Sequence, residues 1–464
     1  MKHYDVIIIG SGPAGIFAAL ELLKHLQNVK IMIIEKGKDI EKRVCPMKRW
    51  DTACSGCPEC ALLSGWGGAG AYSDGKLTLS PHIGGSLVQY IGMASLESMI
   101  QDADSTYVHY GAPDHVYGAD DKEIARLSRL ASENNLAFIP STIRHIGTDR
   151  CRTVLRNIRK SLEGKLDILF QSKVKRVLTS KKKAAGILLE DGRKFSAKYV
   201  VLAPGREGSR WLEQEARRLR LTLLKNPVDI GVRVELPAAV LEPLTNIAYE
   251  PKLIFRSGTF NDRVRTFCVN PYGEVVKEYL KGIWTVNGHS YANSRTANTN
   301  FALLVSTFFT EPFDEPILYG TYIAGLANLL GKGVIVQRLG DLHHGRRSTR
   351  ERIGQGSVKP TLKDATPGDL SFVLPYRYLS DILEMLEAMD RIAPGVNSDE
   401  TLLYGAEVKF YSMLPKLTES LETETANIFA VGDGAGVSRG LIQASVSGMI
   451  AAQEIIRRVE RDGF

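Results

Sequence analysis

The 464-residue chain lacks any long apolar run, and this excludes a membrane-spanning helix. No stretch approaches the roughly 18 uninterrupted apolar residues that such a helix needs. The first residues are typical of a core strand rather than of a signal sequence, so we expect a cytoplasmic protein without a membrane partner. In that compartment its six cysteines are not expected to form structural disulfides. Internal repeats and low-complexity segments are also absent.

Strong charge of either sign is missing as well. The net charge of +7 is mild for this length, so it neither demands a nucleic-acid partner nor excludes one, and no such partner is expected. A hydrophobic content of 44% and a charged content of 24% are ordinary for a soluble protein. A chain of this size should form two or more domains with a sizeable core.

Residues 1–36 contain the most informative pattern in the sequence. An apolar strand, Val6 to Ile9, leads into the glycine turn 10–15, a helix and a second strand that ends at Glu35. In a dinucleotide-binding βαβ unit, such glycines permit a tight turn, a close approach to a pyrophosphate and close packing of helix on strand. The phosphates would lie at the helix N-terminus, and an acid at the position of Glu35 can accept a hydrogen bond from a ribose.

The last forty residues favour FAD over NAD as the dinucleotide. An apolar strand, 428–431, runs into Gly432-Asp433-Gly434, and a second glycine turn, 436–440, precedes a helix of small residues. Asp433 beside a helix N-terminus suits the ribitol hydroxyls of FAD, which NAD does not have. These residues resemble the terminal GD motif of FAD-containing oxidoreductases of the glutathione-reductase-like superfamily.

Three further segments sharpen this resemblance. GWGGAGAYSDGKL (65–77), APGR (203–206) and GDGAGVSRGLIQAS (432–445) resemble the widespread bacterial family of FAD-dependent dehydrogenases, and the likeness extends over essentially the whole chain. The resemblance implies a Rossmann-like FAD-binding domain of the glutathione-reductase and hydroxylase type, built from discontinuous segments, plus an α+β substrate or cap domain. It implies flavin-dependent redox chemistry but no particular substrate.

The predicted cofactor site combines the glycine turn, the following acid, the second glycine loop and the terminal motif. Its candidate FAD-binding residues are Gly10, Ser11, Gly12, Pro13, Ala14, Gly15, Glu35, Lys36, Gly67, Gly68, Ala69, Gly70, Val174, Ala203, Gly205, Gly432, Asp433, Gly440, Leu441 and Ile442.

Two features of related disulfide reductases are absent. The sequence contains no second strand-GxGxxG-helix unit for NAD(P)H, and no CxxxxC redox pair follows the strand that ends at Glu35. Electrons would therefore come from NAD(P)H docked transiently without its own Rossmann domain, from a protein donor, or from the substrate.

Four of the six cysteines cluster just before the second glycine loop. Cys45, Cys54, Cys57 and Cys60 could converge on a zinc ion or an iron-sulfur cluster, although their spacing departs from the ferredoxin pattern. Redox-active thiols and plain reduced cysteines are the alternatives.

Candidate catalytic groups are harder to choose, because spacing does not show which side chains face the flavin. Backbone N–H groups of the loop 65–76 would stabilise charge on the reduced flavin, with Asp74 and Lys76 positioning flavin or substrate. His289, in the polar stretch 287–291, is the first candidate for proton transfer, with a satisfied core histidine as the alternative.

The predicted domains follow from these motifs. Residues 1–80, 165–232 and 401–464 are assigned to the FAD-binding domain, 81–164 to a mainly helical insertion, and 233–400 to the substrate or cap domain, with helical patterns at 299–309 and 380–389. We expect an enzyme, an FAD-dependent oxidoreductase that moves a hydride between flavin N5 and a small organic substrate. A flavin monooxygenase using transiently docked NAD(P)H, a tRNA-modifying flavoprotein and a non-catalytic flavin-binding protein are the alternatives.

Overall fold

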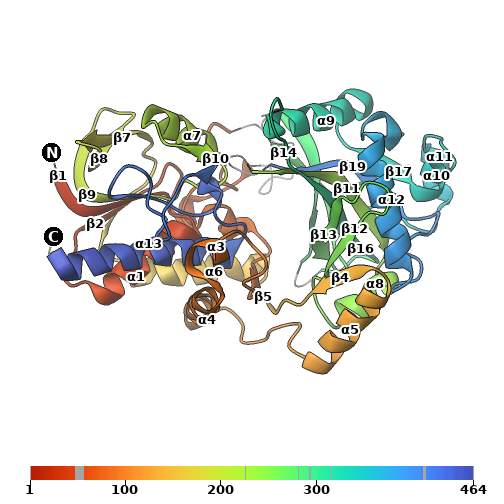
Figure 1. Ribbon diagram of the computed structural model, residues 1–464, viewed down its shortest axis with the longest axis horizontal. Coiled ribbons are helices and arrows are strands. Elements are labelled where there is room, and N and C mark those ends of the chain that lie inside the picture. Colours follow the sequence, from red (N-terminus) through yellow and green to blue (C-terminus); the bar gives the residue numbers. More distant parts are fainter. Residues whose placement is uncertain are drawn as a thin grey trace. The chain divides into compact units, whose positions relative to one another are not determined.

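The computed structural model describes residues 2–46, 57–224, 226–280, 282–291, 294–313, 315–410 and 414–462. The chain divides into two compact units (Figure 1). Unit 1 contains residues 1–115, 144–225 and 412–464, and unit 2 contains residues 116–143 and 226–411.

Unit 1 is built on a mixed sheet. In the described chain, the strand order is β6-β2-β1-β9-β8-β7, with β21 also paired to β9. The strands β6, β2, β1, β9 and β21 run parallel, whereas β7, β8 and β9 form an antiparallel meander. The strands are β1 (Lys2–Ile9), β2 (Ile31–Ile34), β6 (Asp167–Leu169), β7 (Val174–Ser180), β8 (Lys183–Leu189), β9 (Lys194–Leu202) and β21 (Ile428–Ala430).

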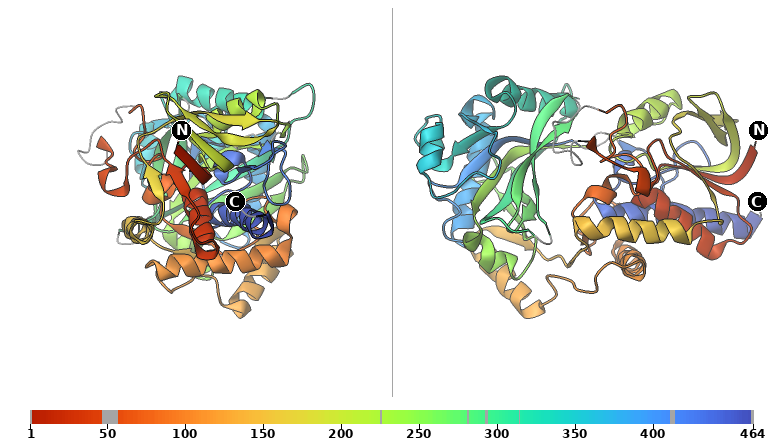
Figure 2. Two further views of the ribbon diagram at one scale, coloured as in Figure 1. Left: turned by 90° about the vertical axis from the view of Figure 1, so that its left-hand side faces the viewer. Right: turned by 180° about the vertical axis from the view of Figure 1, so that it is seen from behind.

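Two helices from opposite ends of the chain pack together in unit 1. Helix α1 (Pro13–His25) and the long C-terminal helix α13 (Leu441–Asp462) run side by side in all three views (Figures 1 and 2). A Cβ atom added to Gly448 would lie 2.0 Å from the carbonyl oxygen of Ala14. The absence of a side chain at Gly448 therefore allows this close packing.

The remaining elements of unit 1 are short strands and helices around this core. They are η1 (Ile40–Lys42), η2 (Gly68–Tyr72), β3 (Lys76–Thr78), α3 (Val88–Ile91), α4 (Met93–His109), α6 (Thr148–Ser161), α7 (Ser209–Arg218), β10 (Leu223–Leu224), β20 (Leu414–Pro415) and η4 (Asp433–Ala435). The strand β5 (Ile143–His145) begins at the boundary between the units.

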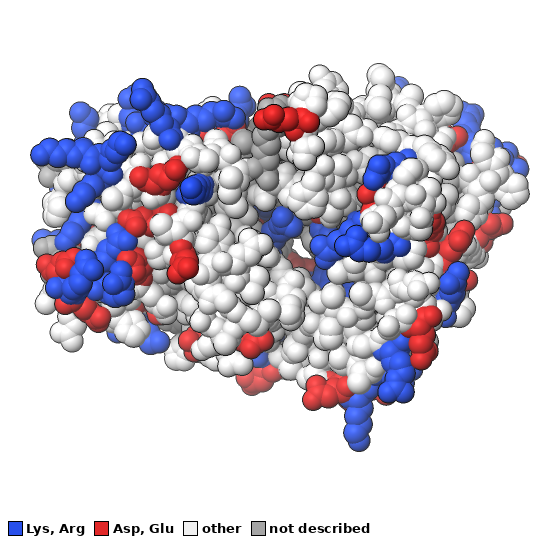
Figure 3. All heavy atoms as spheres, viewed as in Figure 1, with Lys and Arg blue, Asp and Glu red and all other residues white. Residues whose placement is uncertain are grey.

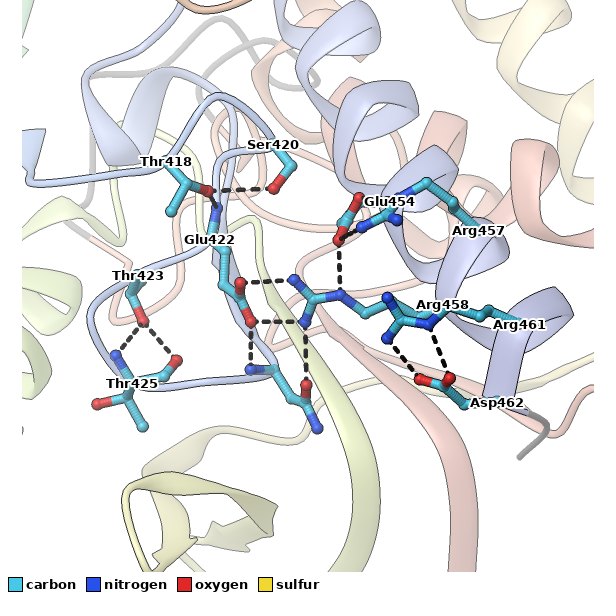
Figure 4. Close-up of polar contacts among 11 residues, drawn as sticks. Thr418, Ser420, Glu422, Thr423, Thr425, Glu454, Arg457, Arg458, Arg461 and Asp462 are labelled. Atoms are coloured by element: carbon cyan, nitrogen blue, oxygen red, sulfur yellow. Dashed lines mark hydrogen bonds and ion pairs between the residues drawn. The ribbon is translucent and has the colours of Figure 1, made fainter.

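An ionic network holds the segment before β21 against α13 (Figure 4). Arg458 donates to both oxygens of Glu422, at 2.8 and 2.7 Å, and its Nε donates to Glu454 at 2.6 Å. Glu422 also accepts from the backbone N–H of Asn427, the residue that precedes β21, at 2.6 Å. This network ties the entry of β21, and so the glycine turn that follows it, to the C-terminal helix.

Unit 2 is organised around a second, larger sheet. In the described part of the chain its order is β18-β17-β19-β11-β16-β13-β12-β4. The long central strands are antiparallel neighbours, and β14 (Glu274–Leu280) and β15 (Ile283–His289) form a separate hairpin. The sheet strands are β4 (Leu136–Ile139), β11 (Val228–Pro237), β12 (Lys252–Arg256), β13 (Arg263–Asn270), β16 (Asn298–Thr307), β17 (Ile335–Arg338), β18 (Thr366–Pro367) and β19 (Leu402–Lys409).

Helices cover the apolar face of this sheet. Helix α12 (Tyr376–Asp390) shares one hydrophobic core with alternate residues of β11 and β16, such as Ile230 and Leu303. The other helices are α5 (Asp121–Glu133), α8 (Ala238–Thr245), α9 (Pro316–Gly331), α10 (Leu339–His343), α11 (Arg350–Gln355) and η3 (Leu370–Phe372). No helix among the described residues has both the length and the apolar character needed to cross a bilayer.

One element expected from the sequence is wrong. The helix expected at 299–309 is instead the central strand β16, whereas the one expected at 380–389 is part of α12. β16 is buried on both faces between β11 and β13, so its apolar run shows no strand alternation. The expected insertion 81–164 divides between the units, because 116–143 belongs to unit 2 and the rest to unit 1.

Candidate functional site

The first glycine turn connects β1 to α1 at the carboxyl end of the parallel strands. Gly10 has a φ of +104°, and a Cβ added there would lie 2.1 Å from the carbonyl oxygen of Ala203 at the end of β9. A Cβ on Gly15 would lie 2.0 Å from the carbonyl oxygen of Gly10. Both positions therefore require glycine, and together they place the N-terminus of α1 directly against the sheet.

Glu35 at the end of β2 organises the surrounding backbone. Its Oε2 accepts from the N–H and hydroxyl of Ser11, at 3.0 and 2.8 Å, and its Oε1 accepts from the N–H groups of Gly37 and Gly65, at 2.8 and 3.0 Å. The side chain is buried, and these four donors occupy the acceptor positions that a carboxylate offers. Glu35 thus joins the first glycine turn to the loop that begins at Gly65.

The loop 65–72 lies against the first glycine turn. The N–H of Gly67 donates to the carbonyl of Ser11 at 2.8 Å, and a Cβ on Gly68 would lie 3.1 Å from the Cα of Gly12. A Cβ on Gly70 would lie 2.8 Å from Leu441 at the start of α13. The predicted glycines of this loop therefore do come together with those of the first turn.

A buried arginine holds this loop in place, and sequence analysis missed it. Arg43 is fully buried, and its guanidinium donates only to backbone carbonyls among the described residues, including those of Ala61, Trp66 and Gly68 at 2.6 to 3.0 Å. Burial lowers its pKa to about 10. A lone arginine 22 residues before a glycine loop carries no signal of this role in the sequence, because the contacts exist only after the loop folds back.

The glycine turn that contains the GD motif, 432–434, follows β21. Gly432 has a φ of +77°, and a Cβ on Gly434 would lie 2.3 Å from the carbonyl oxygen of Gly205. Asp433 accepts from the hydroxyl of Ser438 at 2.8 Å, and burial raises the pKa of its carboxyl group above the ordinary value. The terminal GD motif thus lies beside Gly205, just after the end of β9.

Three of these glycines, Gly12, Gly205 and Gly440, have open space where a side chain would be. We call this region of exposed backbone the cradle. A Cβ on Gly205 or Gly440 would meet no atom within 4 Å, and one on Gly12 would meet only the Cα of Gly68, at 4.0 Å. A small cavity beside the first turn is lined by residues that include Pro13, Gly70 and Leu441. A long ligand can therefore approach bare backbone at the N-terminus of α1.

The other predicted cofactor residues occupy the edges of this region. Val174 begins β7. Two residues earlier, Ser172 donates its N–H to the backbone carbonyl of Glu35 at 3.0 Å. Lys36 forms ion pairs with Glu207 and Glu59, and burial lowers its pKa.

The predicted catalytic residues fall in different units. Asp74 and Lys76 form an ion pair of 3.1 Å in unit 1. Beside them lies His145, which the sequence analysis did not select, and burial lowers the pKa of its imidazole against the opposing effect of Asp74. His289 lies at the end of β15 in unit 2.

The cysteine cluster is described only in part. Cys45, Cys57 and Cys60 are half-buried, whereas Cys54 lies outside the described residues. Within the described ranges, no group of three or more His, Cys, Asp or Glu side chains is placed to hold a metal ion. The four-cysteine site stays a prediction.

Comparison with known proteins points to FAD. Residues 227–410 match the family described as "FAD-dependent protein, C-terminal domain-like". An uncharacterized protein of Clostridium beijerinckii is 28% identical over 482 residues, covering 98% of this chain and 81% of that protein. The family match supports the coarse expectation of an FAD-dependent protein.

The chain also has distant similarity to solved structures of two dehydrogenases and a deaminase. The FAD-complexed glycerol-3-phosphate dehydrogenase of Bacillus halodurans is 11% identical with a TM-score of 0.40, covering 99% of this chain but only 65% of that protein. The L-proline dehydrogenase of P. horikoshii is 11% identical with a TM-score of 0.40, covering 99% and 98% of the two chains. The L-amino acid deaminase of Proteus vulgaris is 12% identical with a TM-score of 0.41, covering 98% and 94%.

Proposed function

We propose that this chain is an FAD-dependent oxidoreductase that transfers a hydride between a small organic substrate and bound FAD. The observation that carries the proposal is the cradle in unit 1, where the turns at Gly12, Gly205 and Gly440 present bare backbone beside the N-terminus of α1. Backbone N–H groups and the positive end of the helix dipole favour a pyrophosphate there.

Each part of the cradle has a distinct task in this proposal. The first glycine turn binds the pyrophosphate, Asp433 accepts hydrogen bonds from the ribitol, and N–H groups of the loop 65–72 face the flavin ring. FAD, when bound, supplies the two-electron chemistry at N5. Asp74, Lys76 and His145 form a polar group in the same unit, where a neutral imidazole is available to accept a proton.

Electron supply and compartment are part of the same proposal. NAD(P)H that docks transiently is the first candidate donor, with a protein donor as the second. The cytoplasm is the proposed location.

Gly12→Asp tests the cofactor site without disturbing the fold. Gly12 has an extended backbone (φ −75°) at the N-cap of α1, where aspartate is favoured, and its Cβ would meet no close atom. We expect the variant to fold at least as stably as the wild type and to bind FAD at least 100-fold more weakly, because the carboxylate repels the pyrophosphate. Gly354→Asp is the matched control, since its Cβ also enters open space, but in unit 2.

The measurement is the absorption spectrum of anaerobically purified protein, with iron and zinc analysis of the same sample. Flavin bands in the wild type and the Gly354→Asp control, but not in Gly12→Asp, would support the proposal. Bleaching by NADH or NADPH would identify the nicotinamide donor, and oxygen consumption coupled to hydroxylation would indicate a monooxygenase. Wild-type protein with no flavin and no affinity for added FAD would refute the proposal.

A further inference from the structure

The positive charge of the chain is concentrated in one segment of unit 1. Residues 173–220 contain fourteen Lys and Arg against five Asp and Glu, a net charge of +9, whereas the whole chain has +7. All other residues together are therefore slightly acidic. The mild net charge of the whole chain therefore conceals a strong local excess of positive charge.

This charge lies on an exposed surface made by the meander and α7. Nine of the cations are exposed and have no carboxylate within ion-pair distance in the described chain. One of them, Arg206, lies between β9 and α7; we call the other eight the basic band: Lys175, Arg176, the lysines 181–183, Lys194, Arg210 and Arg220. In Figure 3, Lys and Arg gather along the upper edge of unit 1, over the position of β7 and α7 in Figure 1.

Local contacts fix the two parts of this surface to each other. Arg218 in the last turn of α7 donates to the carbonyl of Val177 in β7 at 2.7 Å, and the N–H of Val177 donates to Glu215 at 2.8 Å. The basic C-terminal end of α7 is thereby held beside the basic start of β7. The seven residues of β7 extend over roughly 20 Å, so the band spans several successive phosphates of a duplex.

The hairpin turn between β7 and β8 carries lysines where the backbone disfavours them. Ser180 pairs with Lys183, and the two central residues, Lys181 and Lys182, have φ values of +48° and +57°. Such a two-residue turn favours Asn-Gly, because both positions are left-handed. Lysine at both positions lowers the stability of the hairpin turn. We therefore attribute the presence of Lys181 and Lys182 to their positive charge.

We propose that the basic band docks on the phosphate backbone of a double-stranded nucleic acid. Lysines act as point charges that suit phosphate contacts. Membrane insertion is disfavoured, because none of the exposed large apolar side chains in the described chain lies within 173–220. An acidic protein surface is a poorer partner, since protein interface cores are depleted in lysine and need apolar anchors.

The test uses the full-length protein and a fluorescently labelled RNA duplex of arbitrary sequence. Binding is measured by anisotropy as a function of salt, and we expect the logarithm of the association constant to fall steeply with the logarithm of salt concentration. Lys181→Asn/Lys182→Gly removes two charges and also installs the preferred turn. At about 0.1 M salt, we expect it to weaken binding about 60-fold and to flatten the salt slope by about two, because each contact contributes about 0.9 to that slope.

The matched control removes two lysines from unit 2. Lys332→Asn/Lys363→Gln makes the same charge change, and Lys332 also has a left-handed φ, of +50°. We expect this control to bind the duplex within about twofold of the wild type, and the hairpin variant to unfold in urea no earlier than the wild type. The proposal is overturned if the two variants bind alike, if salt has no effect, or if phosphatidylserine vesicles or polyglutamate bind more tightly than the duplex.

Discussion

Replacing Glu35 with Gln removes one of two oxygen atoms that each accept two hydrogen bonds in the buried centre of the cofactor site. The amide nitrogen that takes its place cannot accept from the N–H of Ser11, which lies 3.0 Å from Oε2. An orphaned buried N–H costs about 1–3 kcal/mol, and the bonds that remain lose the strength that a charged acceptor gives. We therefore expect Glu35→Gln to lower the free energy of unfolding of the FAD-free protein by about 2–4 kcal/mol.

The assay is urea unfolding of FAD-free protein, paired with an FAD titration. Glu41→Gln is the control, because Glu41 is an exposed carboxylate paired with Arg156 and should contribute less than about 1 kcal/mol. If Glu35→Gln unfolds within about 0.5 kcal/mol of the wild type, the inference that Glu35 organises the apo site is refuted. Unchanged apo stability with a large loss of FAD affinity would instead identify Glu35 as a ribose ligand, as the sequence pattern predicts.

Other perturbations follow from packing and burial. Gly448→Ala should destabilise the protein by about 2–3 kcal/mol in urea unfolding, because its Cβ would overlap the carbonyl of Ala14, whereas Gly325→Ala in α9 has open space and should be neutral or gain up to about 1 kcal/mol. Arg43→Gln should cost roughly 3 kcal/mol by the same assay and weaken FAD binding, since several carbonyls lose their donor. Burial raises the pKa of Asp381 to about 6, so the folded state binds more protons than the unfolded state between about pH 4 and 6. Because this pKa lies about two units above the ordinary value, stability should fall by up to about 3 kcal/mol as the pH rises through this window, and Asp381→Asn should remove that dependence in pH-resolved urea curves.

The backbone conformation of the glycine turn 10–15 was predictable from the sequence because a short motif specifies it. The Cβ positions of Gly10 and Gly15 collide with backbone that lies within the same βαβ unit or at the end of the adjacent strand. A motif of a few residues is enough to indicate such a constraint. The GD turn was recognised by its motif, although its close contacts with Ala14 and Gly205 join residues that are distant in the sequence.

The supporting residues were not predictable, since they act across long separations. Arg43 reaches carbonyls that become neighbours only when the loop 61–68 folds back, and His145 meets Asp74 across about seventy residues of chain. β16 was mistaken for a helix because burial on both faces removes the alternation that identifies a strand. The basic band was not predicted, because the net charge of the whole chain combines the basic segment 173–220 with a slightly acidic remainder.

Support for FAD comes from two separate parts of the chain. All the predicted cofactor-binding residues lie between Gly10 and Gly205 or between Gly432 and Ile442, and their support is the geometry of the backbone in unit 1. The family match covers only 227–410, which lie in unit 2 and contain none of those residues. The cradle and the matched segment share no residue, so the two observations are independent of each other. The agreement of the two therefore supports an FAD-dependent protein more strongly than either does alone.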